Sequence, residues 1–438
     1  MNIMNIANPQ PYKTTVQDAS RSLSSIYAEF QLQKAARKTA PKIRDSIAIA
    51  FVALTVTIIA YSGLFNTVPI LLLYVLWYPQ IFIRGLVVVR PSADMVASLL
   101  LPMLACFSAF WSDYRTDTLH HGLEFVSMLL CIIIMARTVR MDAFVKGIIA
   151  GTAIALIATI INGTYGRDYF SGTYSLVGLF GSKNQVGFTA QVGILAAVAF
   201  LMGENPVWEK ILFSILPLVL FSVSLYLSKS ATATLSLFVV LCVLAIVFVI
   251  TWLPRTIRWP VFAITAVGLI LIVVAVMNLD LQDKILAGFG KDSTLTGRTY
   301  LWQEGYKIGW SRPVLGHGYS AFWVPGQPQA ERYWYEFQIY GKSGFHFHEL
   351  FIQTFVDLGF CGLAIIVLLI LSNLCRTLRL AMRDGMNTGS VFLLALSTMF
   401  LVRAFVEVDF LGPFGTGVLL FYSIIPRLAT ISENQPAS

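Results

Sequence analysis

The sequence predicts an all-α polytopic membrane protein with about 12 transmembrane helices and one long loop outside the cytoplasmic membrane. Of its 438 residues, 57% are hydrophobic and only 12% are charged, whereas average soluble domains carry about 25% charged residues. The mean hydropathy of +0.73 points the same way. So few polar side chains cannot cover a soluble surface, which excludes soluble enzymes, DNA-binding proteins and secreted disulfide scaffolds.

The membrane spans are predicted from apolar runs, because a transmembrane helix needs about 20 mostly apolar residues. The second run is the least regular, since Pro79, Gln80 and Arg84 interrupt it. The runs lie near residues 46–62, 67–89, 93–110, 119–136, 142–162, 185–203, 209–227, 232–253, 259–279, 349–372, 389–406 and 411–429.

Basic residues set the expected orientation, because Lys and Arg gather on cytoplasmic loops. The segment 1–45 is polar and basic, has no cleavable signal peptide, and is expected to be cytoplasmic. Helices 1–9 then occupy 46–279, a long loop outside the cytoplasmic membrane occupies 280–347, helices 10–12 occupy 348–429, and 430–438 form a cytoplasmic tail. The even-numbered, inner links carry Arg90, Arg137, Arg140, Lys210, Arg255, Arg258, Arg376, Arg379 and Arg383. This pattern accounts for the net charge of +8 without a nucleic-acid partner.

Polar residues that look out of place gather at the outer ends of the predicted helices. Lys183 opens helix 6, and Lys229 lies in a link too short to be anything but a tight turn. Both lysines could instead extend to the lipid headgroups. Arg403 and Glu407 are four residues apart on predicted helix 11, a spacing that allows an ion pair inside the bundle. Charges within membrane helices are nevertheless functional candidates.

The long loop supplies the remaining candidates. Arg298 follows Gly297, and His346 and His348 stand where the loop re-enters the membrane. The positive end of the next helix favours a neutral imidazole at His348, whereas Glu349 acts in the opposite direction. Guanidinium and ammonium groups bind phosphate oxygens, and a neutral histidine can accept a proton from a hydroxyl. These residue types suggest group transfer from a lipid diphosphate, and they also fit an anion transporter.

Several motifs together resemble the O-antigen ligase and Wzy-type polymerase superfamily. Within the long loop these are Asp292-Ser-Thr-Leu-Thr-Gly-Arg298-Thr-Tyr-Leu-Trp302, Arg312-Pro-Val-Leu-Gly316-His-Gly318-Tyr-Ser-Ala-Phe-Trp323 and His346-Phe-His348-Glu-Leu350. Asp357-Leu-Gly359 follows them, and Gly178-Leu-Phe-Gly181-Ser-Lys183-Asn184 and Leu227-Ser-Lys-Ser230 precede them. The Ala-Phe-Trp ending at Trp323 is similar to the exopolysaccharide polymerase branch. The resemblance covers most of residues 110–425.

Two positions depart from the superfamily's pattern. Many members have His-Asn at the re-entry point, where this chain has His348-Glu349. Many also have an arginine after the second serine of the helix 7–8 turn, where this chain has Ala231. An anion-binding role at that turn would pass to Lys229.

The resemblance implies a fold like that of the C-type glycosyltransferases and a multi-pass protein of the bacterial inner membrane with a periplasmic active site. The implied reaction moves a glycan from undecaprenyl diphosphate to a sugar hydroxyl, with inversion and with neither a metal ion nor another cofactor. It implies that His348 is the base and Arg298 the catalytic diphosphate-binding arginine. Lys183 and Lys229 match supporting cations. Substrate contacts are also expected from His346, Arg403 and Glu407.

Four functions remain open at this stage. A polymerase would extend lipid-linked repeats of exopolysaccharide or O-antigen, with a chain-length regulator as a further partner, and it is preferred because of the Phe322-Trp323 region. A ligase would transfer the finished glycan to lipid A core. A flippase or transporter is a third reading, but the spans show no paired Gly/Pro-broken segments. A metal-dependent transferase using Glu407 and Asp409 is the fourth, and two carboxylates alone make a weak metal site.

Overall fold

The computed structural model describes residues 42–65, 67–167, 174–278, 297–342 and 344–433. Much of the expected cytoplasmic segment 1–45, including Lys34, Arg37 and Lys38, therefore lies outside the described residues, as do 279–296 of the long loop and the tail from 434. The described chain is almost entirely helical, with two short antiparallel strands that pair Tyr165 with Leu176. This confirms the all-α class.

The α-helices and strands follow the chain in this order: α2 Asp45–Ala60, α3 Val68–Trp77, α4 Pro79–Arg84, α5 Ala93–Phe107, α6 Arg115–Thr138, α7 Met141–Asn162, β1 Tyr165–Arg167, β2 Tyr174–Leu176, α8 Lys183–Met202, α9 Val207–Lys210, α10 Leu216–Ser228, α11 Ala231–Thr251, α12 Arg255–Asn278, α14 Arg298–Ser311, α15 Pro328–Glu336, α16 Leu350–Asp384, α17 Thr388–Arg403 and α18 Thr416–Glu433. Short 3-10 helices occupy Ser62–Leu64, Leu86–Val89, Ser108–Phe110 and Gly178–Phe180, and a π-helix, Ile211–Ile215, joins α9 to α10.

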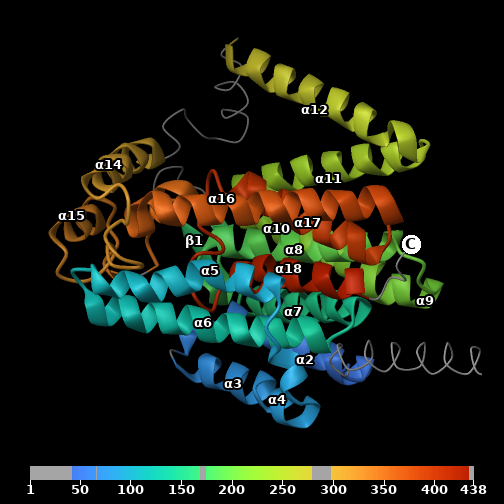
Figure 1. The fold of residues 1–438 in the computed structure, drawn as a ribbon, viewed down its shortest axis with the longest axis horizontal. Coiled ribbons are helices and arrows are strands. Elements are labelled where there is room, and N and C mark those ends of the chain that lie inside the picture. The colour runs from blue at the N-terminus through green and yellow to red at the C-terminus, as the bar shows by residue number, and fades with distance from the viewer. Residues whose placement is uncertain (1–41, 66, 168–173, 279–296, 343, 434–438) are drawn as a thin grey trace, which may run out of the picture.

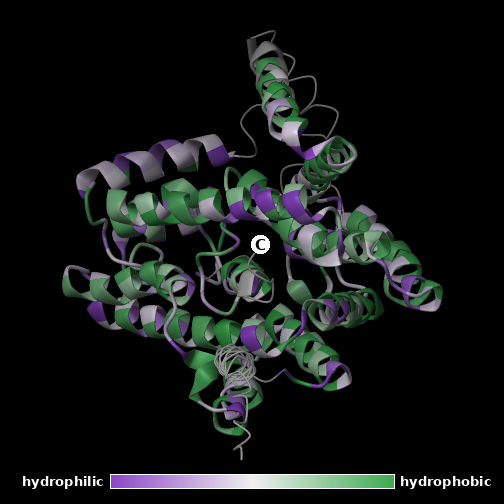
Figure 2. Ribbon diagram, turned by 45° about the vertical axis from the view of Figure 1, so that its right-hand side comes forward, coloured by the Kyte–Doolittle hydropathy of each residue, from purple (hydrophilic) through white to green (hydrophobic). Residues whose placement is uncertain are grey.

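Each predicted apolar run falls largely on helical segments. Run 67–89 divides into α3, α4 and a 3-10 helix, and run 209–227 crosses the end of α9, the π-helix and α10. Within the described residues, 7 helices are long and apolar enough to cross a membrane, and 4 shorter apolar segments accompany them. Figure 2 shows that hydrophobic residues dominate the long helices. The protein is therefore a multi-pass membrane protein, and the total of about 12 spans stays a prediction.

The centre of the bundle is formed by α8, α17 and α18 (Figure 1). Helix α8 is the most enclosed of the candidate spans, with 78% of its apolar window buried. Helix α17 packs against α8, α11 and α16, and α18 packs against α5 and α6. Because no polar partner is available in a bilayer core, these central helices satisfy their backbone groups within themselves.

Several predicted helix ends are wrong by more than a turn or in a way that matters for function. The runs predicted from 119 and 259 begin four residues earlier, at Arg115 and Arg255. The tenth predicted helix, 349–372, continues as α16 to Asp384 because its polar last turns stay helical beyond the apolar run. The last helix begins at Thr416 instead of 411. The eleventh ends at Arg403 instead of 406, so Glu407 lies beyond the helix.

The described part of the long loop is an ordered unit at one end of the bundle (Figure 1). It contains α14 and α15, which share a buried core with the re-entry segment: Leu301, Ile308, Phe322, Ala330, Tyr333, Trp334, Phe347 and Val356. Phe347 is fully buried there, and Trp302 Nε1 donates a hydrogen bond of 3.0 Å to its carbonyl oxygen. The loop core therefore fixes the backbone on which His346 and His348 stand.

The loop also binds to a break in α16. At Gly359 the backbone leaves the helical region, with φ 62° and ψ −158°. The peptide groups freed there pair with the segment Pro313–Gly318: His317 N donates to Val356 O at 2.9 Å, Gly318 N to Asp357 O at 2.9 Å, and Phe360 N to Pro313 O at 2.8 Å. The Pro-x-x-Gly-x-Gly and Asp-Leu-Gly motifs of the sequence thus meet and hold the loop on the bundle.

Candidate functional site

His348 occupies a strained turn immediately before α16. Its φ is 55°, in the left-handed region that few non-glycine residues adopt. Three contacts hold the turn: His348 N donates to His346 Nδ1 at 3.0 Å, Glu349 caps α16 by accepting from Ile352 N, and Leu350 N donates to Ala404 O at 2.9 Å. Glu349 therefore performs the capping task that asparagine, a good helix N-cap, would perform at this position.

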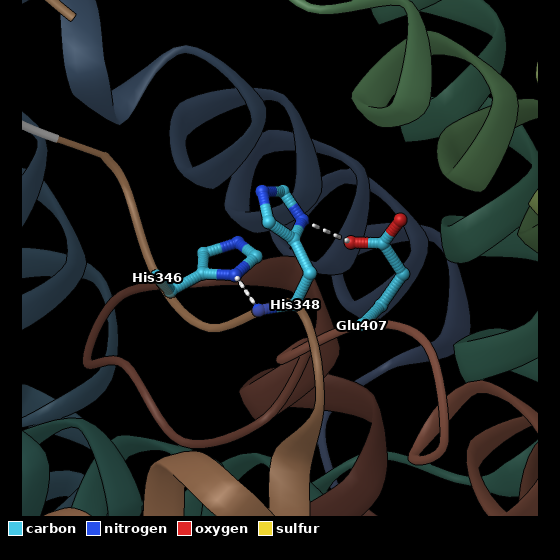
Figure 3. Close-up of side chains that lie close together, drawn as sticks. All are labelled: His346, His348 and Glu407. Carbon is cyan, nitrogen blue, oxygen red and sulfur yellow. Dashed lines mark hydrogen bonds and ion pairs between the residues drawn. The ribbon is translucent and has the colours of Figure 1, made fainter. Parts of the chain in front are cut away.

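Glu407 lies at the centre of the site and is contacted from three elements. Its Oε1 accepts hydrogen bonds from Arg298 Nη2 at 3.1 Å and from Asn184 Nδ2 at 3.2 Å. Its Oε2 faces His348 Nδ1 at 3.7 Å, close enough for electrostatic attraction but too long for a hydrogen bond. Figure 3 shows the imidazole of His348 turned toward this carboxylate, with His346 beside it.

Arg298 is the first residue of α14 and faces the segment that follows α17. Its Nη1 donates to Val406 O at 2.6 Å while Nη2 contacts Glu407, and its side chain is 16% exposed. A guanidinium has five N–H donors, so these two hydrogen bonds leave other donors of Arg298 for an anion. Glycine at 297, with φ 85°, lets the chain enter α14 at this angle.

Lys183 and Lys229 lie beside the hydrogen-bond network of Glu407, because their sequence neighbours Asn184 and Ser230 belong to it. Ser230 Oγ donates to Asn184 Oδ1 at 3.3 Å, which joins the α10–α11 turn to Asn184 and then to Glu407. Lys229 forms that tight turn, as predicted, with φ 48° and an exposed side chain. Lys183 is the first residue of α8, also as predicted.

Asn184 and Ser230 are site residues that sequence reasoning missed, although both lie in quoted motifs. A neutral amide and hydroxyl carry no charge signal, so only their positions beside Lys183 and Lys229 could have indicated them.

The expected ion pair between Arg403 and Glu407 is wrong. Because α17 ends at Arg403, the chain turns and brings Asp409 to this arginine: Arg403 Nε lies 2.5 Å from Asp409 Oδ2 and Nη2 lies 2.9 Å from Oδ1. Arg403 is only 2% exposed and lies over the ring of Phe188 at 4.7 Å. It therefore supports the chain beneath the site, and Glu407 is released to face Arg298 and His348.

The pKa values of two side chains of the site differ from those of isolated side chains. Burial, with the adjacent His348, lowers the pKa of His346 to about 3. Burial alone would raise the pKa of Glu407, but His348 and the positive charge of Arg298 hold it well below its usual range. Near neutral pH the group therefore contains an ionised Glu407 and a neutral His346, whose Nδ1 can accept the His348 N–H.

The same residues offer a possible metal site. Ligand atoms of His346, His348 and Glu407 all lie within 4.8 Å of one another. However, the guanidinium of Arg298 already places a fixed positive charge on the Glu407 carboxylate. A divalent cation would be repelled there, so the donor set fits a metal poorly. Glu407 and Asp409 do not form a ligand pair either, since Asp409 is bound to Arg403.

Comparisons with known proteins match the chain across this region. A family model described as O-antigen ligase matches residues 216–367, which include Arg298 and His348. The exopolysaccharide production protein ExoQ of Rhizobium meliloti (strain 1021) is 36% identical over 400 residues, covering 91% of this chain and 91% of that protein.

Proposed function

Because this chain belongs to the O-antigen ligase and exopolysaccharide polymerase family, we propose that it is a glycosyltransferase that polymerises glycan repeats linked to undecaprenyl diphosphate. The repeats would form exopolysaccharide or O-antigen. The active site would face the periplasm from the inner membrane. The observation that carries the proposal is the single carboxylate of Glu407 shared by Arg298 and His348.

His348 is the general base in this proposal. The ionised carboxylate faces Nδ1 and favours the tautomer with its proton on that atom, which leaves Nε2 as the acceptor. Nε2 takes the proton of the acceptor sugar hydroxyl while that oxygen bonds to the anomeric carbon of the donor. The bond from the anomeric carbon to the diphosphate oxygen breaks in the same displacement, which inverts the anomeric configuration.

The cations stabilise the leaving group. Undecaprenyl diphosphate departs with additional negative charge, and preorganised positive groups stabilise such charge best where water is excluded. Arg298 supplies the fork of donors, and Lys183 and Lys229 supply point charges at the start of α8 and in the α10–α11 turn. His346 orients His348 by accepting its backbone N–H.

The proposal is tested with purified protein in lipid vesicles and one chemically defined donor, an undecaprenyl diphosphate carrying a single repeat. A polymerase extends a second copy of this molecule and produces a ladder of longer lipid-linked chains. The alternative function, suggested by the ligase name of the matching family, predicts transfer only when lipid A core is supplied. A ligase would therefore produce no ladder from the donor alone.

A further inference from the structure

An arginine-rich pocket lies at the end of the bundle opposite His348. Its volume is about 460 Å³, and it is lined by Arg255, Arg258 and Trp259 at the start of α12 and by Arg376, Arg379 and Arg383 in the last turns of α16. Helix α16 runs the length of the bundle (Figure 1), and at about 1.5 Å per residue its last turns lie roughly 40 Å from His348.

Among the described residues, carboxylates face two of these five arginines. Arg376 Nη1 binds Asp94 at 2.7 Å, and Arg383 Nε binds the adjacent Asp384 at 2.7 Å. Arg255, Arg258 and Arg379 form no ion pair with any residue in the described ranges.

Arg258 instead donates to main-chain oxygens, including Thr251 O at 2.7 Å, and so fixes the end of α11 to the start of α12. The pocket therefore carries an excess positive charge that no carboxylate in the described part of the chain balances.

The surface that leads away from the pocket is apolar. Trp259, which lines the pocket, is 45% exposed, and Trp252 at the end of α11 is 74% exposed. On the same helix faces, eleven residues along from Arg258 and Arg379, Leu269 of α12 and Leu368 of α16 are 43% and 66% exposed. Tryptophan favours the membrane–water boundary, and exposed aliphatic side chains of a span contact lipid chains. A cationic pocket that continues into lipid-facing surface fits a ligand with an anionic head and an apolar tail.

We propose that this pocket binds the phosphate headgroup of an anionic phospholipid, whose acyl chains lie along α12 and α16. Guanidinium groups bind phosphate oxygens in a bidentate way, and basic pockets between transmembrane helices bind anionic headgroups. The predicted orientation assigns this lipid to the cytoplasmic leaflet. Because α12 packs against α11 and α16, the lipid would also tie α12 to the bundle.

Native mass spectrometry of the full chain in detergent tests the proposal with two lipids of identical acyl chains, phosphatidylglycerol and phosphatidylcholine. The wild type should retain phosphatidylglycerol preferentially. The double variant Arg255→Gln/Arg379→Gln should lose that preference by on the order of tenfold, since each surface arginine contributes to anionic-lipid attraction. Arg379→Gln alone, at an exposed side chain without an ion pair in the described chain, should show part of the loss.

The control Arg115→Gln/Lys307→Gln removes two exposed positive charges at the opposite end and should keep the preference. Equal retention of both lipids by the wild type would overturn the proposal, as would an unchanged preference in the folded double variant. Displacement of the lipid by glycerol phosphate at equal concentration would show a site for soluble anions instead, which also contradicts it.

Discussion

The ionic partners of Glu407 depend on where helix α17 ends. A helix extended to residue 406 would pair it with Arg403, which is the pairing the four-residue spacing predicts. The helix ends three residues earlier, and the apolar run around it gives no sign of that end. The sequence was sufficient to select Arg298, His348 and Glu407 as candidates, because charged groups in apolar surroundings are conspicuous. It was insufficient to pair them, because pairing depends on a turn that composition does not mark.

Arg298→Lys tests the role of the guanidinium fork. Lysine keeps the charge, but its three donors share one nitrogen, so contacts to Val406 O and Glu407 would leave it a single donor and no fork for a diphosphate. We expect glycan transfer to fall by roughly 10²-fold or more, the usual effect of removing a preorganised donor. Arg332→Lys on α15, where the side chain is exposed and pairs with Glu336, is the matched control and should retain activity. Near-normal transfer by Arg298→Lys would refute the role.

His346 should make stability depend on pH. Its folded pKa of about 3 lies below the value of about 6.5 for an unfolded histidine. Between these values the unfolded chain binds the extra proton, so stability is present above about pH 6.5 and is lost as the pH falls toward 3. The pKa of Glu407 is also depressed. The stability that this gives is lost only as the pH falls below about 4.3, the pKa of an unfolded glutamate.

Thermal unfolding in detergent at pH 6.5 and pH 4.5 isolates the histidine when wild type and His346→Gln are compared, because every other titrating group is common to both proteins. Between pH 6.5 and pH 4.5 the unfolding temperature of the wild type should shift downward relative to that of His346→Gln. An identical pH dependence in the two proteins would mean that His346 is not held neutral in the fold.

At the scale of elements, helix positions were predictable and loop structure was not. Long apolar runs identify spans with little ambiguity, whereas α14 and α15 are short and mostly polar, so their helical pattern is hidden in a loop. The break at Gly359 was also hidden, because it lies inside a continuous apolar run. Both Gly316 and Gly359 were noted as motif residues, and their contact follows only from the fold.

Gly316→Ala tests whether the loop must dock on the break in α16. A Cβ at Gly316 would lie 2.5 Å from the carbonyl carbon and oxygen of Asp357, so the loop must shift. We expect transfer to fall sharply, since a small displacement of catalytic groups is costly. Gly326→Ala is the matched control: its φ of 88° imposes similar strain, but no atom of the described residues lies within 4 Å of the added Cβ. Equal effects of both changes would show that strain, not docking, is responsible.

At the scale of the whole molecule, the orientation in the membrane is the main prediction. In a chain whose native cysteines are replaced, Gln329→Cys on α15 and Glu204→Cys between α8 and α9 give exposed probes at opposite ends. An impermeant thiol reagent should label position 329 once the outer membrane is permeabilised, and position 204 only after the inner membrane is broken. The reverse pattern would place the His348 site on the cytoplasmic side and contradict the mechanism.

The fold brings together segments far apart in the sequence: Asn184 from α8, Arg298 from α14, the turn at His348 and Glu407 after α17. The claim that this convergence is the site of transfer is tested most directly by His348→Asn. Asparagine tolerates the positive φ of this position but cannot act as a base. The protein should therefore stay folded, and its unfolding temperature should match that of the wild type.

The decisive measurement is the rate of glycan transfer by purified His348→Asn from a defined undecaprenyl diphosphate donor, beside the wild type and His120→Asn, a change at an exposed histidine. We predict a fall of about 10²–10⁴-fold for His348→Asn, the contribution of a positioned general base. His120→Asn should match the wild type, and a chelator should not change the wild-type rate. A wild-type rate in folded His348→Asn, or full loss of wild-type transfer on chelation, would contradict the account.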